Sequence, residues 1–460
     1  MMSRDINENL VPIESREQLV EYFAAGEKPR EEWGVGTEHE KFMFRRDNFE
    51  MASYDGDGGI GQILARLRDD KGWEPAYDNG DIVALEQRDP DGKVRAITLE
   101  PGGQFELSGA VYNTVYETAD ELDSHFELMR EMTAPDGDNP GMEMVCWGAN
   151  PFFDRPEIPW MPKSRYKIMR EYMPKQGDLA HSMMKQTCTV QANFDYATES
   201  DASEIIRTSL LISPIASAIF ANSPFIAGED TGMQTFRGHI WTRTDPARCG
   251  WPEFMYRDDW GYADYLEYIL DVPMFFIARD GKYINKAGDS FRDFMKNGHG
   301  EYNATMGDFE LHLSTAFPEI RLKRFVEIRG ADAGPRDHMV AMPALWKGIL
   351  YHEPARKRAA DLLGKVDPTS HAQLFHDAYK RGLKAESAQG TVRELAGELL
   401  SISADGLDAI ADAQGHPSER LLLAPLEEIV NTGKSLADQL RDDWESLDGD
   451  RQKLVEKWAF

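Results

Sequence analysis

The stretch GVGTEHEKF, residues 34–42, has the alternation of a β-strand and places two glutamates on either side of a histidine. Residues two apart in a strand point the same way, so Glu38 and Glu40 are predicted to project side by side from one face. His39 then points to the opposite face, where we expect it to pack, since the sequence offers no H-E-x-x-H partner. Two like charges this close repel each other, so a metal ion, a proton or water is expected between the carboxylates.

Two further strand-like segments, ITLEPGGQFELSG (97–109) and FVEIRG (325–330), carry acidic groups among Phe, Leu and Ile. A single glutamate in a strand is usually a solvated outer-face residue, but these segments show little sign of a polar outer face. Buried carboxylates in such numbers must be neutralised by protons, basic partners or cations. Oxygen ligands of this type suit hard ions, Mg²⁺ or Mn²⁺ in particular. The polar residues concerned are Glu100, Gln104, Glu106 and Glu327.

Basic residues of three segments are candidates to bind the substrate phosphate groups that accompany magnesium in many enzymes. The segments are MPKSRYK, FRGHIWTRTD and RLKRFVEIRG, with Arg165, Arg237, Arg243, Lys323 and Arg329. The alternative for each is a surface charge on a solvated helix, and for Arg321 and Lys323 it is the favoured interpretation. The sequence contains no Walker A motif and no protein-kinase catalytic loop, so an ATP site here would be of another type.

Strands are predicted along the first three-quarters of the chain without regular β-α-β alternation, which favours an α+β fold with a mainly antiparallel sheet. The segment QTCTVQANFDY, residues 186–196, alternates as a strand, with Gln191 and Asn193 on one polar face. A helix predicted over residues 201–220 should kink or divide at Pro214.

From about Trp346 onward the sequence is rich in Ala, Leu and Glu with helical periodicity. We therefore expect residues 1–350 to form a catalytic core. Residues 351–460 should form a mostly helical region that packs on this core, and the two parts should be one structural unit.

The composition limits the range of partners. The chain has 460 residues, 41% of them apolar, and no apolar run long enough to cross a bilayer. A net charge of −29 argues against nucleic-acid or membrane partners, because both need a cationic surface. Residues 1–14 lack the charged-then-apolar layout of a signal peptide. Three cysteines without a C-x-x-C pair indicate free thiols in a reducing compartment, so we expect a cytoplasmic protein.

Eight strings in chain order give the sequence its resemblance to a known family. They are GTEHEKF, ITLEPGGQFELSG, PKSRYKIMREYMP, TCTVQANFD, FANSPF, RGHIWT, DVPMFF and RLKRFVEIRGADAGP. Together they closely resemble the plant-type glutamate–cysteine ligases, found also in some bacteria, over about residues 31–350. The resemblance implies a glutamine-synthetase-like core, in which a curved antiparallel sheet surrounded by helices forms a cage around metals, ATP and glutamate.

The resemblance also implies residue roles. The metal ligands it implies are Glu38, Glu40, Glu100 and Glu106, with Gln104 and Glu327 as additional contacts. The substrate contacts it implies are Arg165 and Arg237 for glutamate, Trp241 and Phe275 for cysteine, and Gln191 and Asn193 along the cage. We expect ATP contacts from Arg329, Arg243 and Lys323, and catalytic roles for Glu40, Arg237 and Arg329. Plant members tend to have Tyr where this chain has Phe275, so a hydroxyl is lost there.

The implied activity is ATP-dependent joining of the γ-carboxylate of glutamate to the amino group of cysteine through a γ-glutamyl phosphate. This is the first step of glutathione biosynthesis, and its cofactors are ATP and Mg²⁺ or Mn²⁺. The residues by themselves leave open a different amine acceptor, a guanidine kinase-like phosphotransferase or a non-catalytic binding protein. The oligomeric state stays open between monomer and homodimer.

Overall fold

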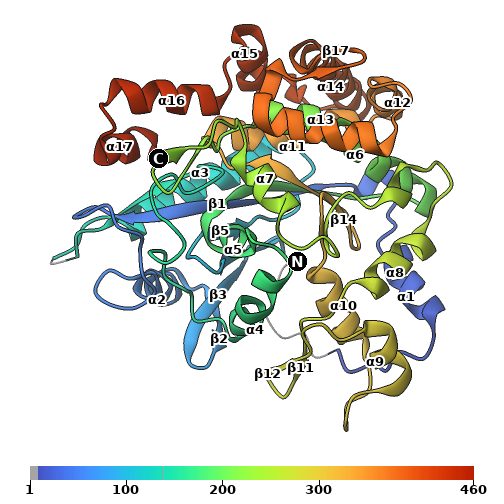
Figure 1. Ribbon diagram of the computed structural model, residues 1–460, viewed down its shortest axis with the longest axis horizontal. Coiled ribbons are helices and arrows are strands. Elements are labelled where there is room, and N and C mark those ends of the chain that lie inside the picture. Colours follow the sequence, from blue (N-terminus) through green and yellow to red (C-terminus); the bar gives the residue numbers. More distant parts are fainter. Residues whose placement is uncertain (1–8, 138) are drawn as a thin grey trace.

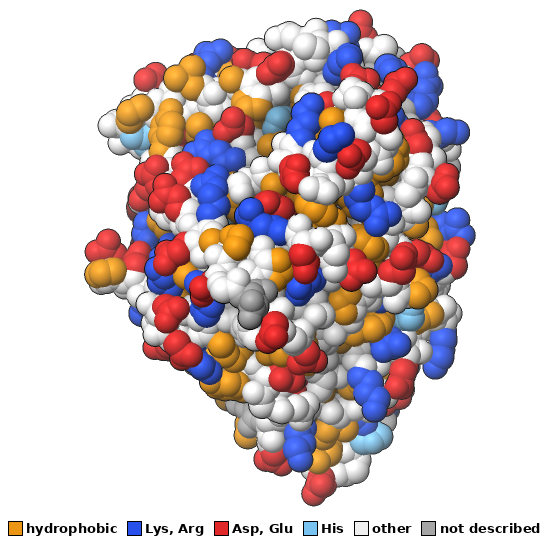
Figure 2. Space-filling view, turned by 90° about the vertical axis from the view of Figure 1, so that its left-hand side faces the viewer, with side chains coloured by type: hydrophobic (Ala, Val, Ile, Leu, Met, Phe, Trp, Pro, Cys, Tyr) orange, Lys and Arg blue, Asp and Glu red, His pale blue; other side chains and the backbone are white. Residues whose placement is uncertain are grey.

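The computed structural model describes residues 9–137 and 139–460. The expectation about residues 1–14 therefore falls partly outside the described residues. On the face drawn in Figure 2, acidic and basic side chains are interspersed. The negative net charge is thus not gathered into one patch on that face.

A nine-stranded sheet forms the centre of the fold (Figure 1). Its strands follow the order β14-β15-β7-β1-β5-β4-β3-β2, and β6 also pairs with β1. Every pairing in this sheet is antiparallel, which confirms the predicted α+β class. The strands are β1 (Val35–Arg45), β2 (Glu74–Asp78), β3 (Asp81–Arg88), β4 (Val94–Leu99), β5 (Phe105–Ser108), β6 (Met142–Val145), β7 (Thr189–Phe194), β14 (Ile320–Leu322) and β15 (Val326–Asp332).

β1 is the central strand, and residues 35–44 are all buried. It pairs with β7 through residues 35–39, with β5 through residues 38–41 and with β6 through residues 42–45. Glu38 and Glu40 share one face, as the alternation predicts. The ring of His39 packs on the other face, 5.5 Å from the ring of His125. The predicted packing role of His39 is confirmed.

Helices cover both faces of the sheet. α3, α6 and α11 pack against the face that bears His39. α4, α5, α7 and α10 surround a cavity on the opposite face. Their bounds are α3 (Val115–Met132), α4 (Ser164–Tyr172), α5 (Ala180–Gln186), α6 (Glu199–Ile219), α7 (Phe236–Thr242), α10 (Met306–Ser314) and α11 (Arg336–Leu350).

Helix α6 runs through Pro214 as one helix, so of the two predicted outcomes, a kink or a division, the division is wrong and the kink stays a prediction. Proline removes one backbone hydrogen bond from the helix, and the residues of α6 around it, 208–219, are all buried. This helix is long and apolar enough to cross a membrane, but 89% of its apolar window is buried inside the protein, as in a core helix. Strand β7 begins later than its alternation predicts, because Thr187 is the C-cap of α5 and its hydroxyl donates to Met183 O at 2.7 Å.

The C-terminal helices lie together along one side of the molecule, drawn in orange and red in Figure 1. Their apolar side chains, including Leu395 and Leu454, belong to the same hydrophobic cluster as Val35 and Val190 of the sheet. The division at residue 350 stays a prediction. These helices are α12 (Glu353–Asp361), α13 (Pro368–Arg381), α14 (Val392–Gln414), α15 (Ala424–Thr432), α16 (Leu436–Ser446) and α17 (Arg451–Trp458).

Shorter elements complete the chain. The helices are α1 (Arg16–Ala24), α2 (Ile60–Lys71), α8 (Tyr262–Asp271), α9 (Phe291–Asn297), η1 (Arg30–Glu32), η2 (Met173–Lys175), η3 (Glu253–Tyr256), η4 (Gly382–Lys384) and η5 (Glu419–Leu423). The two-stranded pairs are β8 (Phe225–Ile226) with β9 (Glu229–Asp230), β10 (Cys249–Gly250) with β13 (Phe317–Pro318), β11 (Phe276–Arg279) with β12 (Lys282–Asn285), and β16 (Glu386–Ser387) with β17 (Gly390–Thr391).

Candidate active site

A cavity of about 480 Å³ lies on the face of the sheet opposite His39. Strands β1, β5, β7 and β15 contribute its floor, and α4, α5, α7 and α10 contribute its walls. It gathers most of the residues that the sequence predicts for a site, although they come from distant parts of the chain. The predicted residues that line it are Glu40, Glu100, Gln104, Glu106, Arg165, Gln191, Arg237, Trp241, Lys323 and Arg329.

Three carboxylates lie close together on the neighbouring strands β1 and β5: Glu40 and Glu106 line the cavity, whereas Glu38 is next to them and does not line it. Glu40 of β1 lies directly opposite Glu106 of β5 in the antiparallel register, and Glu38 lies two residues earlier. Each accepts one hydrogen bond from the protein: Glu38 from Asn193 Nδ2 at 2.9 Å, Glu40 from the Thr189 amide at 3.0 Å, and Glu106 from the Thr98 hydroxyl. One oxygen of each carboxylate is thereby fixed.

Burial and the neighbouring acids make Glu40 and Glu106 hard to ionise. Burial raises the pKa of Glu40 well above its usual value, and the charges of Glu100 and Glu106 raise it further. Burial, followed by the charges of Glu38 and Glu100, raises the pKa of Glu106 to about 8. A cation placed among these groups would remove both penalties.

The donor set fits a hard cation. Glu38 Oε2 is buried and has no hydrogen-bond partner among the described residues, which leaves it available as a ligand. Clustered carboxylate oxygens without thiolates or imidazoles suit Mg²⁺ or Mn²⁺. In residues 9–137 and 139–460, no three acidic, histidine or cysteine side chains are already arranged around one metal position. Binding would therefore require side-chain rotation toward a common centre.

Gln104 and Glu327 have other partners. Gln104 Oε1 accepts from the Gly102 amide at 2.9 Å, and its Nε2 donates to Thr187 O at 2.9 Å, which ties β5 to the end of α5. Glu327 is paired through both carboxylate oxygens with Arg321, its cross-strand partner, and does not line the cavity. The structure therefore places Glu327 in an ion pair instead of among the expected metal ligands.

A basic wall lines the same cavity as the carboxylates, made of Arg321 on β14, Lys323 directly after β14 and Arg329 on β15. Glu327 lies behind it, 3.7 Å from Lys323 Nζ and 3.4 Å from Arg329 Nη1. Burial and the neighbouring Arg321 lower the pKa of Lys323 to about 8. Arg329 Nη1 donates to Gln191 Oε1 at 2.7 Å, so its position is fixed from β7. The wall offers three cations to an anionic ligand.

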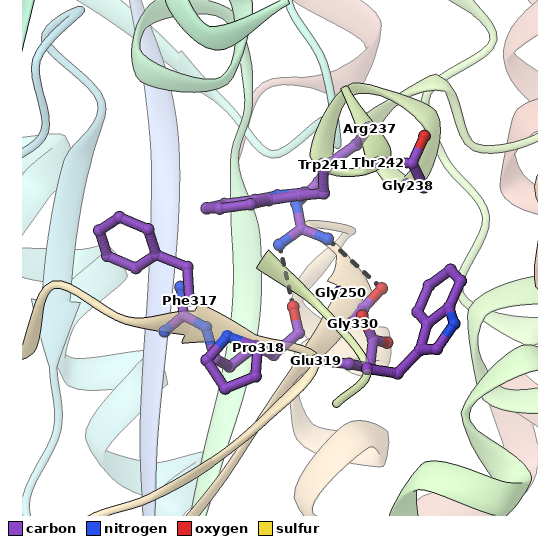
Figure 3. A pocket seen from close by; sticks show the side chains of 11 residues that line it. Arg237, Gly238, Trp241, Thr242, Gly250, Phe317, Pro318, Glu319 and Gly330 are labelled. Carbon is purple, nitrogen blue, oxygen red and sulfur yellow. Dashed lines mark hydrogen bonds between the residues drawn. The ribbon is translucent and has the colours of Figure 1, made fainter. Parts of the chain in front are cut away.

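Arg237 enters the cavity from α7 and is held by backbone carbonyls of β15 (Figure 3). Its Nη2 donates to Arg329 O at 2.9 Å and its Nη1 to Gly330 O at 3.3 Å. Arg165, at the start of α4, lies on the cavity too, with its guanidinium carbon 5.3 Å from the Tyr166 ring. Two arginines from separate helices thus face one binding volume.

Buried hydrogen bonds fix the start of α7. Thr235 caps the helix, and its hydroxyl donates to Asp332 Oδ1 at 2.8 Å. The Ser223 hydroxyl donates to Asp332 Oδ2 at 2.6 Å and accepts from the Arg237 amide at 3.0 Å. Tyr379 O of α13 accepts from the Thr235 amide at 3.0 Å. The C-terminal region therefore supports the site as well as the core, which its helical composition gave no reason to expect.

Besides Glu38 and Glu327, three further predicted residues do not line the cavity. Arg243 pairs with Asp178 at the surface, with about half of its side chain exposed, 49%. Phe275 packs against the Arg248 guanidinium at 3.8 Å, and its neighbour Phe276 lines the cavity in its place. Asn193 does not line the cavity and acts through its bond to Glu38. The expected ATP contact of Arg243 and cysteine contact of Phe275 therefore do not match their positions.

Other lining residues were not predicted. They include Tyr22, Met169, Met183, Met184, Thr189, Phe276 and Glu310. Strand alternation could have predicted Thr189 as a lining residue, because it shares the polar face of its strand with Gln191. The methionines lie on α4 and α5, and helical periodicity by itself does not distinguish a cavity wall from a core.

Comparisons with known proteins identify the family of this chain. The sequence model of glutamate-cysteine ligase family 2 matches residues 34–457. The chain is 41% identical over 426 residues to glutamate–cysteine ligase B, chloroplastic, of Oryza sativa subsp. japonica, covering 89% of this chain and 83% of that protein. It is 39% identical over 430 residues to glutamate–cysteine ligase, chloroplastic, of Arabidopsis thaliana, covering 93% and 79%. A solved bifunctional glutathione synthetase from Pasteurella multocida is similar with a TM-score of 0.49 and 12% identity, covering 96% of this chain and 53% of that one.

The chloroplastic names of these plant relatives contradict the cytoplasmic location expected from the sequence. That expectation was wrong because free thiols indicate a reducing environment and do not identify the compartment. The family match extends over most of the chain and includes every residue that lines the cavity from Glu40 to Arg329. This protein therefore belongs to glutamate-cysteine ligase family 2.

Proposed function

We propose that this protein forms γ-glutamylcysteine from glutamate, cysteine and ATP, the first step of glutathione biosynthesis. The observation that carries the proposal is the pairing of opposite charges across one cavity. Carboxylates of β1 and β5 face arginines and a lysine of α7, β14 and β15. A ligase that activates a carboxylate with ATP needs both a cation site and a basic surface for the phosphoryl group.

The carboxylates of Glu38, Glu40, Glu100 and Glu106 would hold Mg²⁺. When bound, Mg²⁺ neutralises the transferring phosphoryl group and orients it for in-line attack. The Thr189 amide and Asn193 each hold one oxygen of Glu40 and Glu38, respectively, which leaves the other oxygen of each carboxylate available to a cation.

The arginines and the lysine act on the anionic reactants. Arg165 and Arg237 bind glutamate carboxylates, for which the planar guanidinium offers two parallel N–H donors. Lys323 and Arg329 stabilise the phosphate oxygens as the γ-carboxylate of glutamate becomes an acyl phosphate. The cysteine amine then displaces phosphate through a tetrahedral intermediate, whose negative charge the same cations stabilise.

A phosphate-release assay tests this function. With ATP, Mg²⁺ and glutamate present, we expect phosphate release to depend on cysteine and to yield γ-glutamylcysteine, identified by mass spectrometry. Release that does not respond to cysteine would contradict the proposed acceptor. A panel of other amines reveals a different acceptor, and a phosphorylated guanidine product reveals a phosphotransferase.

Mg²⁺ is expected to stabilise the protein more at pH 8 than at pH 6. The folded-state pKa of Glu106, about 8, lies above its ordinary value of 4.5. Its stabilising contribution in the metal-free protein is therefore complete below pH 4.5 and is lost as the pH rises through 8. A cation that binds the ionised form restores stability where the loss is greatest. At 100 times its dissociation constant it should add about 2.7 kcal/mol, or roughly 3 °C in Tm.

Thermal unfolding with and without Mg²⁺ at the two pH values measures this effect. Glu106→Gln should reduce the pH dependence of the Mg²⁺ shift, and Glu40, whose pKa is also raised, accounts for what remains. Glu121→Gln is the matched control, because Glu121 is also buried but is bound to the Ala110 amide and the Tyr112 hydroxyl away from the cavity. An equal Mg²⁺ shift at both pH values in the wild-type protein would contradict the assigned cation site.

A further inference from the structure

A second, much smaller cavity of about 20 Å³ lies beside the large one, between α7 and the strands β10, β13 and β15 (Figure 3). Arg237, Trp241, Phe317 and Arg329 line both cavities, so the small one lies directly behind part of the active-site wall. One water molecule needs about 10–15 Å³ of such volume. The small cavity therefore has room for one water and not for a substrate.

Three buried polar atoms on residues that line the small cavity have no hydrogen-bond partner within the described part of the chain. They are Glu319 Oε1, Arg237 Nε and Trp241 Nε1. The first is an acceptor, and the other two are N–H donors. Buried polar atoms of proteins are almost always hydrogen-bonded to protein or to ordered water. Two donors and one acceptor match the bonding capacity of a single water molecule.

Glu319 Oε1, the acceptor, lies against the backbone of Gly330, whose carbonyl binds Arg237. A Cβ atom on Gly330 would lie 1.9 Å from Glu319 Oε1, so the carboxylate rests directly against the Gly330 backbone. The carbonyl of the same residue accepts from Arg237 Nη1 at 3.3 Å. Glu319 is thus adjacent to the guanidinium but forms no ion pair with it within 4.0 Å in the described residues.

The charged surroundings favour a bridged arrangement. Burial raises the pKa of Glu319 to about 7, and the positive charges of Arg237 and Arg329 oppose that rise. Burial raises the pKa of the Tyr256 and Tyr379 phenols, and the negative charge of Glu319 contributes further, so both phenols lie close enough to interact with it electrostatically. Both the ionised and the protonated carboxyl group keep an oxygen that can accept a hydrogen bond from water.

We propose that one water molecule binds in this cavity, accepts from Arg237 Nε and Trp241 Nε1, and donates to Glu319 Oε1. Glu319 is then a positioning residue for Arg237. Backbone carbonyls hold the two Nη atoms and the bridged water holds Nε, so the plane of the guanidinium is fixed from three directions. The remaining Nη hydrogens are then presented to the substrate side, and this part of the inference rests on the proposed function.

A crystal structure of the wild-type protein tests the water site without reference to activity. We expect an ordered water within hydrogen-bond distance of both Glu319 Oε1 and Arg237 Nε. A direct contact between the two side chains, or no ordered water at high resolution, would overturn the proposal. This measurement needs no variant and no substrate, so a failure of the proposed function does not affect its outcome.

Two variants of Glu319 test the positioning role. Glu319→Ala removes the acceptor and should raise the KM for glutamate about tenfold, the cost of one hydrogen bond to a charged group, while kcat stays within about twofold. Glu319→Gln keeps an acceptor oxygen and should restore KM to within about twofold of wild type. Gly330→Ala, whose methyl group would displace Oε1, should reproduce the alanine phenotype. Equal KM values for the alanine and glutamine variants, or an unchanged KM in both, would overturn the positioning role.

Discussion

Replacing Glu40 by glutamine is expected to lower kcat for γ-glutamylcysteine formation by about 10²–10³-fold, as for other groups that stabilise developing charge. Glu40 lines the cavity, opposite Glu106 in the sheet and held by the Thr189 amide. Glutamine preserves the shape but removes the charge that attracts a cation. Initial rates at saturating substrates, measured across a Mg²⁺ titration, give the effect.

Loss of folding can be separated from loss of function in this variant. The pKa of Glu40 is raised by burial and by neighbouring acids, so a neutral side chain should leave the Tm of the metal-free protein at pH 8 unchanged or higher. Glu74→Gln is the control, because Glu74 is exposed on β2 at the edge of the sheet. A Glu40→Gln protein with normal kcat and normal Mg²⁺ dependence would rule out the assigned cation site.

Replacing Arg237 by lysine is expected to raise the KM for glutamate by about 10–100-fold, the range for losing a charged hydrogen bond. The guanidinium bonds to two successive carbonyls, Arg329 O and Gly330 O, and still has N–H groups for a substrate carboxylate. An ammonium group cannot satisfy both carbonyls and a bidentate carboxylate at once.

Arg243→Lys is the matched control for this substitution. Arg243 follows α7 in the sequence but pairs with Asp178 at the surface. The KM of the Arg243→Lys protein for glutamate should therefore stay within about twofold of wild type. KM values for glutamate, cysteine and ATP should be measured for both variants. If Arg237→Lys raised only the KM for ATP, Arg237 would belong to the nucleotide part of the cavity.

Most of what the sequence could predict about the site came from the alternation of side-chain direction along its strands. Alternation placed Glu38 and Glu40 on one face of β1 and His39 on the other, because side-chain direction in a strand depends only on position. The same reasoning put Gln191 on the cavity side of β7. A group of acids among large apolar residues then pointed to a buried charged site.

The ion pairs could not be predicted from local pattern. Arg321 and Glu327 oppose each other across a tight hairpin, and a known register would have revealed their pairing. Arg243 meets Asp178 from 65 positions away, and no local signal marks that contact. Glu319 lies between two very short strands, where periodicity gives no information on direction. In each case the partner is set by tertiary packing.

The pairing order around β1 has a consequence for synthesis of the chain. β1 comes near the N-terminus, but its neighbour β7 is made much later, and Asn193 bonds to Glu38 across 155 positions. The basic wall follows later still, on β14 and β15. Contacts between such distant segments form slowly. While the ribosome is still translating the middle of the chain, β1 is a hydrophobic segment with a row of acids and no partner. A nascent chain of this kind depends on chaperones or rapid completion to avoid aggregation.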